Sequence, residues 1–178
     1  MNTLVALCAL GAEKVLGNEI KQLGYSLKDM KGVKTPGRIT FLGDDDALFK
    51  ANLCLRTADR VYLQLASYKA EDFDSLFDGV YNIPWQDYFY KDVRLVIDKV
   101  RTHKSKLSSE HSIQGIVHKA VYTKLGDVWH IHTMPETGSQ ADVRIYIENN
   151  QVSVLLDLSG VPLHRRGYRK DGGVAPII

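Results

Sequence analysis

The stretch VRLVIDKVRTHKSKLSSEHSIQGIVHKAVYTKL, residues 93–125, decides the fold of the second half of the chain. Residues 93–97 are mostly large and apolar, which predicts a buried strand. The strand is expected to run on into residues 99–106, in which Lys104 and Lys106 continue into the loop that follows. A serine at position 108 or 109 can then cap a helix over residues 110–125, since a hydroxyl accepts hydrogen bonds from the first helical turn. The stretch therefore predicts one strand followed by one helix.

The same stretch carries the largest charge asymmetry in the chain. Residues 99–125 contain six Lys or Arg and one Glu, although the whole chain has 23 basic and 21 acidic residues. Alternation along a strand places Lys99, Arg101 and His103 on one face, and the helix N-terminus near Glu110 favours phosphate. A solvated charged face is the alternative interpretation. The phosphate-binding surface that we predict consists of Lys99, Arg101, His103, Lys104, Lys106, His111, His118 and Lys119.

Residues 1–66 predict a separate domain. Apolar and turn patterns indicate strands at 3–8, 26–33, 38–42 and 61–66, with helices at 13–23 and from Asp44 to about residue 55. The helix at 13–23 is expected to bury Val15, Leu16 and Ile20. The resulting order β-α-β-β-α-β is the ferredoxin-like arrangement.

Residues 67–162 predict a second domain with a different order. Short helices are expected at 73–80 and 85–90, ahead of the strand and helix described above. Strands at 141–148 and 152–158 would close the domain as a hairpin that turns at Asn149-Asn150. The order is α-α-β-α-β-β. The sequence thus predicts an α+β fold in which the two domains pack closely together.

No motif predicts catalysis or a metal site. Neither a Gly-rich dinucleotide fingerprint nor a P-loop is present, and His130-Ile131-His132 is interpreted as a loop with surface histidines. Tyr90 and Tyr122 are expected to pack and not to stack on bases. Cys8 and Cys54 are far apart and expected to be buried. No apolar run approaches the roughly 18 residues that span a membrane. We therefore expect a cytoplasmic protein.

Three segments near the end of the chain resemble a known family. They are residues 156–160 (LDLSG), residues 163–169 (LHRRGYR) and residues 175–177 (API). Together with the predicted element order, they resemble the domain junction of bacterial ribosomal RNA large-subunit guanine-N2 methyltransferases.

In that family, a ferredoxin-like domain and a THUMP domain precede an S-adenosylmethionine-dependent methyltransferase domain. The resemblance implies that residues 163–178 connect to such a domain, which the chain lacks together with its S-adenosylmethionine site. It implies binding of structured RNA, here ribosomal RNA, and extends the predicted RNA-binding surface to Arg165, Arg166 and Arg169. The three arginines can equally serve domain docking. A transfer-RNA enzyme with the same module and a protein-interaction domain remain the alternatives.

Overall fold

The computed structural model describes residues 1–28 and 36–159 and divides into two compact units. The first comprises Met1–Tyr62 with Leu158 and Ser159, and the second comprises Leu63–Asp157. Strand β4 (Ala58–Lys69) begins in the first unit and ends in the second. The expected α+β class is confirmed.

The first unit has the predicted β-α-β-β-α-β order. Its elements are β1 (Asn2–Cys8), α1 (Glu13–Gln22), β2 (Ser26–Leu27), β3 (Arg38–Gly43), α2 (Asp45–Cys54) and the start of β4. The strands lie in the order β2-β3-β1-β4, and β3 is antiparallel to both β1 and β2.

Helix α2 begins where the sequence predicts it. The Asp44 side chain accepts a hydrogen bond of 2.9 Å from the Ala47 amide and caps the first turn. A Cβ atom at Gly43 would lie 2.2 Å from that of Ala47, so only glycine lets the helix pack this closely. Two expectations for this unit are wrong: Val15 is 52% exposed, and Cys54, the last residue of α2, is exposed.

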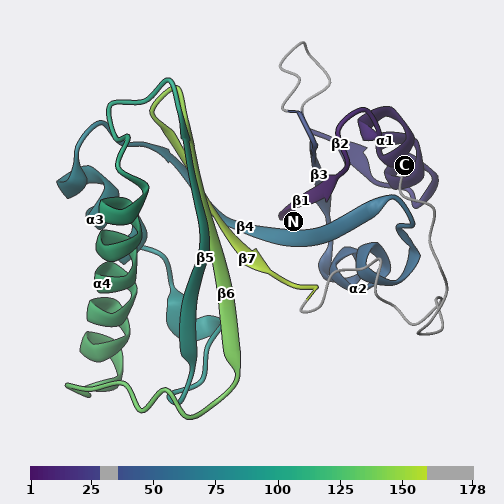
Figure 1. The fold of residues 1–178 in the computed structure, drawn as a ribbon. Coiled ribbons are helices and arrows are strands. Elements are labelled where there is room, and N and C mark those ends of the chain that lie inside the picture. Colours follow the sequence, from purple (N-terminus) through teal and green to yellow (C-terminus); the bar gives the residue numbers. More distant parts are fainter. Residues whose placement is uncertain (29–35, 160–178) are drawn as a thin grey trace, which may run out of the picture. The chain divides into compact units, whose positions relative to one another are not determined.

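The second unit places two helices on one face of its strands (Figure 1). After β4 come α3 (Phe73–Tyr81), the 3-10 turn η1 (Trp85–Asp87), β5 (Arg94–His103), α4 (Glu110–Trp129), β6 (Gln140–Glu148) and β7 (Gln151–Asp157). The strand order is β4-β7-β6-β5, with β5 parallel and β7 antiparallel to β6. The predicted tight hairpin is confirmed, since Asn149 and Asn150 both have positive φ, at 50° and 61°.

The predicted helix at 85–90 is wrong, because the chain forms only the three-residue turn η1 there. Trp85 is fully buried, and its indole nitrogen donates a 2.8 Å hydrogen bond to the Val80 carbonyl at the end of α3. Phe89 stacks on it at 5.5 Å. This packing holds the rings of Trp85 and Phe89 together across the turn η1. The chain then turns toward β5 with a bond from the Val93 amide to the Tyr90 carbonyl.

Every helix within the described ranges is too short or too polar to cross a membrane.

Candidate nucleic-acid interface

A β-bulge at Asp98 determines which side chains of β5 face the core. Ile97 lies opposite Val143 on β6, but Lys99 lies opposite Arg144, so Asp98 is an extra residue between two paired positions. The buried positions therefore change from odd to even numbers along the strand. Leu95 and Ile97 are buried before the bulge, and Val100 is buried after it.

The strands β5, β6 and β7 consequently have two chemically distinct faces. What we call the inner face packs toward α3 and α4 and consists of Leu95, Ile97, Val100, Val143, Ile145, Ile147, Val152, Val154 and Leu156. What we call the outer face carries Lys99, Arg101 and His103 of β5 beside Arg144, Tyr146 and Glu148 of β6. The common face predicted for the three β5 residues agrees with this geometry.

An ion pair holds the bulge in place. Arg144 donates to both carboxylate oxygens of Asp98, with a distance of 3.3 Å from Nε to Oδ1. The two side chains are only 11% and 22% exposed. The charge of Arg144 is therefore largely compensated by Asp98. Lys99, which lies opposite Arg144 on β5, has no such carboxylate partner among the described residues.

On β5, in the loop after it and on α4, the predicted Lys and Arg residues divide into paired and unpaired cations. Arg101 contacts Glu110 at 3.0 Å, and Lys106 contacts Glu71. Lys99, Lys104 and Lys119 have no carboxylate partner among the described residues. These three lysines are the cations that a phosphate can contact without breaking an ion pair that the structure records.

Helix α4 begins with the predicted serine cap. The Ser109 hydroxyl accepts a 3.3 Å hydrogen bond from the Ser112 amide. The buried side of the helix consists of Ile113, Val117, Ala120, Val121 and Leu125. His111 and Lys119 are exposed, and His118 is half-buried. The helix face that the sequence predicts to be polar is therefore available to solvent over most of its length.

The helix continues to Trp129, one turn beyond the predicted end at Leu125. His130 ends it in the left-handed conformation, with φ of 56° and its amide bonded to the Gly126 carbonyl. The Ile131 amide bonds to the same carbonyl at 3.1 Å. A Cβ atom at Gly126 would lie 3.0 Å from the Ile131 oxygen, so Gly126 allows the close return of the chain. This glycine is needed for packing and not for ending the helix.

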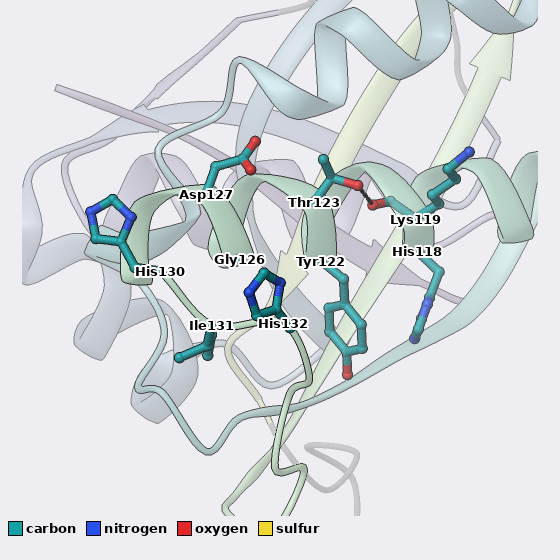
Figure 2. A pocket seen from close by; sticks show the side chains of 9 residues that line it. All are labelled: His118, Lys119, Tyr122, Thr123, Gly126, Asp127, His130, Ile131 and His132. Carbon is teal, nitrogen blue, oxygen red and sulfur yellow. Dashed lines mark hydrogen bonds between the residues drawn. The ribbon is translucent and has the colours of Figure 1, made fainter.

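An open hollow of about 740 Å³ lies along the C-terminal half of α4 (Figure 2). It is lined by His118, Lys119, Tyr122, Thr123, Gly126, Asp127, His130, Ile131 and His132. The sequence predicts the first two as binding residues and the last three as a loop with surface histidines. The αL turn at His130 brings that loop back beside the helix, which periodicity alone does not predict.

Tyr122 forms one wall of the hollow and is fixed by three neighbours. Its hydroxyl donates to Glu136 and accepts a 3.3 Å bond from the Leu95 amide, and its ring lies 4.3 Å from that of His118. Burial and the bond to Glu136 raise the pKa of Tyr122 to about 12. The expected packing role of Tyr122 agrees with these contacts. The same expectation for Tyr90 is wrong, because its side chain is 86% exposed.

The structure thus places the described members of the predicted surface in two groups of the second unit. Lys99, Arg101, His103, Lys104 and Lys106 lie on the outer face and in the loop that follows β5, and His111, His118 and Lys119 lie on α4. Arg165, Arg166 and Arg169 lie outside the described residues. Within those residues, no group of three or more His, Cys, Asp or Glu side chains has a metal-binding arrangement.

Sequence reasoning missed two charged residues at the end of β4, Lys69 and Glu71. Lys69 contacts Glu71 at 2.7 Å, and Glu71 also contacts Lys106. Both lie within residues 66–98, which hold three basic and seven acidic residues, so Lys69 is not part of a basic cluster in the sequence. They lie next to the β6–β7 turn because β4 and β7 are neighbours in the sheet, which the sequence does not reveal.

Comparison with known proteins identifies both units. Residues 3–62 match the RlmL ferredoxin-like domain, and residues 70–157 match the THUMP domain. The chain is 40% identical over 182 residues to the "Putative RNA methyltransferase YpsC" of Bacillus subtilis (strain 168), which covers 98% of the chain and 44% of that relative. It is 34% identical over 178 residues to the "Ribosomal RNA large subunit methyltransferase K/L" of Marinomonas sp. (strain MWYL1), covering 96% of the chain and 23% of the relative.

A solved structure shows the same fold. "SMU.472, a putative methyltransferase complexed with SAH" superposes with a TM-score of 0.84 at 36% identity, over 96% of this chain and 45% of that one. The chain therefore spans less than half the length of these relatives. The resemblance predicted from the sequence is confirmed for the two domains and their order.

Proposed function

We propose that the THUMP unit of this chain binds structured RNA. The chain belongs to the family of proteins in which an RlmL ferredoxin-like domain is followed by a THUMP domain. The observation that carries the proposal is the bulge at Asp98, which turns Lys99, Arg101 and His103 away from the core together. Lys104 and Lys106 continue the same charge into the loop. Lys and Arg groups arranged in this way contact phosphates, which position an RNA without reading its sequence.

Helix α4, which borders the edge of β5, carries the second group of predicted residues. His111, His118 and Lys119 follow one another along its polar side, and the hollow beside His118 adds His130 and His132. A helix of 20 residues is roughly 30 Å long at 1.5 Å per residue. That length corresponds to several nucleotides, so the surface suits an RNA segment better than a single phosphate group.

In the longer protein, the bound RNA would be presented to a methyltransferase. Relatives named as RNA methyltransferases that are more than twice as long support this part of the proposal. The substrate that we propose is large-subunit (23S) ribosomal RNA, and the reaction is methylation of guanine N2. S-adenosylmethionine would supply the methyl group outside this chain, in keeping with the bound SAH of SMU.472. Arg165, Arg166 and Arg169 would then lie between the RNA-binding and methylating parts.

The test is a titration of the chain against ribosomal RNA hairpins at rising salt. We expect log K to fall linearly with log salt, by roughly 0.7–0.9 for each phosphate contact, because each contact releases counterions. Transfer RNA in a parallel titration tests the other RNA class. Salt-independent or absent binding to both would contradict the proposal and favour a protein partner.

Single charge reversals locate the surface. Lys104→Glu and Lys119→Glu break no recorded ion pair, and each should weaken binding about tenfold at low salt while lowering the salt slope by about 1. The matched control is Lys14→Glu, an exposed lysine of α1 in the first unit. Equal losses for the control and the two variants would show a general charge effect and no defined surface.

A further inference from the structure

Three chain segments of the second unit meet around Asn150. The Ala70 amide, just after β4, donates to the Asn150 carbonyl at 2.9 Å. The Lys106 amide donates to Asn150 Oδ1 at 2.8 Å, and the Asn150 amide donates to Ser105 Oγ at 3.0 Å. These bonds fix the backbone of the loop after β5 against the β6–β7 turn and the end of β4. The side chains that project from this frame therefore start from set positions.

One carboxylate lies between two ammonium groups at this point. Glu71 Oε1 is 2.7 Å from Lys69 Nζ, and Glu71 Oε2 contacts Lys106 Nζ. The two lysine side chains are 67% and 65% exposed, and Glu71 is 34% exposed. Hydrogen bonds from Lys106 and Lys69 lower the pKa of Glu71 to about 2, so it is ionised at neutral pH.

A phosphate group could take the place of Glu71 between the two lysines, because it also presents negatively charged oxygens that accept hydrogen bonds from ammonium groups. Exposed pairs of this kind contribute little to stability, because water competes for both partners. A ligand with many phosphates can therefore exchange with the carboxylate. Lys104, exposed and without a carboxylate partner among the described residues, lies two positions before Lys106 in the same loop.

We propose that Lys69 and Lys106 form a phosphate subsite of the RNA-binding surface and that Glu71 is an internal competitor limiting its affinity. The inference rests on the proposed function and adds two residues, Lys69 and Glu71, that neither the sequence pattern nor the comparisons assign. RNA binding at this point exchanges one anion for another between the same two ammonium groups. Glu71 thus lowers affinity for any RNA and leaves the choice of sequence unchanged.

The test is Glu71→Gln, which keeps the shape of the side chain and removes its charge. We expect this variant to bind a ribosomal RNA hairpin about three- to tenfold more tightly at low salt, with a salt slope steeper by about 1. The matched control is Asp46→Asn, which removes the carboxylate of an exposed ion pair with Lys50 in the first unit. The control makes the same change in net charge and should leave the affinity within twofold.

A second comparison ties the gain to the two lysines. The variant Lys69→Gln/Lys106→Gln should bind about tenfold more weakly than the unchanged chain, and adding Glu71→Gln to it should give no gain. Thermal unfolding of each variant shows whether the fold is retained. If Glu71→Gln does not fold, the lysine variant decides, and unchanged affinity in that variant overturns the inference.

The outcomes separate this inference from the proposed function. Absence of salt-dependent RNA binding in the unchanged chain contradicts the proposed function. Normal binding by the unchanged chain, with equal or weaker binding by Glu71→Gln, contradicts only the subsite. A gain that persists without Lys69 and Lys106 would show that Glu71 acts through the general field, and would also overturn the subsite.

Discussion

The inner and outer faces of β5–β7 are built from the same three strands but differ in chemistry over β5 and β6, whereas on β7 the outer-face residue Leu155 is buried opposite Arg144. Ile145 and Val143 on the inner face have no exposed surface, whereas Arg101 and His103 on the outer face are exposed. The sheet assigns side chains to one face or the other by alternation alone, and the bulge at Asp98 resets that alternation once. Because the bulge takes up Asp98 as an extra residue, Lys99 and Arg101 lie on the outer face while Val100 lies in the core.

Inserting one alanine between Val100 and Arg101 should have the largest effect, because side chains alternate between the faces with a period of two. Whichever half of β5 keeps its register, the side chains of the other half turn over. Either Arg101 and His103 enter the core or Ile97 and Val100 leave it. Placing uncompensated charge in a core costs roughly 3–5 kcal/mol per group, so we expect the second unit to lose cooperative unfolding in urea. Deletion of Asp98 is the control, because it removes only the extra residue and leaves the rest of β5 in regular alternation on its present faces. A loss as large in the deletion as in the insertion would contradict the assignment of faces by alternation.

Ile145→Ala tests the inner face alone. The side chain is fully buried between strands and helices, and its truncation should lower the free energy of unfolding by roughly 2–5 kcal/mol. RNA affinity of the folded protein should stay the same, since the outer face is unchanged. Urea denaturation and an RNA titration of the same sample measure both quantities. A large loss of affinity with full folding would contradict the separation of the two faces.

Lys99→Glu tests the outer face alone. We expect RNA affinity at low salt to fall about tenfold and the free energy of unfolding to change by less than about 0.5 kcal/mol, as for other surface substitutions. Fluorescence anisotropy with a labelled hairpin measures the first, and urea denaturation measures the second. Unchanged affinity would restrict the RNA-binding surface to the loop and α4.

The smallest effect concerns pH. Glu71 has its pKa lowered to about 2 in the folded protein from 4.5. Its ion pairs therefore stabilise the fold fully above about pH 4.5, progressively less as the unfolded chain takes up the proton, and not at all below about pH 2. The stability difference between the unchanged chain and Glu71→Gln should accordingly shrink between pH 6 and pH 3. A difference that grows on acidification would contradict the assignment of the shift to Lys106 and Lys69.

The sequence predicts the fold wherever a local signal is sufficient. Asp44 and Ser109 mark helix starts, Asn149-Asn150 marks a turn, and alternation places Lys99 with Arg101. Each of these rests on the chemistry of a few neighbouring residues. The β-α-β-β-α-β order of the first unit follows from the same kind of signal.

What the sequence does not predict depends on contacts between distant residues. The helix expected at 85–90 stops at Asp87, because the indole of Trp85 is hydrogen-bonded to the Val80 carbonyl. Helix α4 continues past the predicted end at residue 125, because Gly126 serves the close approach of Ile131 and does not end the helix. Glu71 meets Lys106 across 35 positions. The bulge at Asp98 lies between these cases: the change in apolar spacing from Ile97 to Val100 is visible in the sequence, but its structural meaning requires the partner strand.

The position of β5 at the end of the strand order has a consequence for solubility. An open strand edge presents unpaired backbone groups to which another chain can add, and this is a route to aggregation. Here the first half of that edge is closed by α4, since Tyr122 accepts from the Leu95 amide and Gln114 donates to the Ile97 carbonyl at 3.0 Å. The second half follows a bulge and carries Lys99 and Arg101. The cations that we propose to contact RNA therefore also oppose the edge-to-edge joining of two copies of this protein.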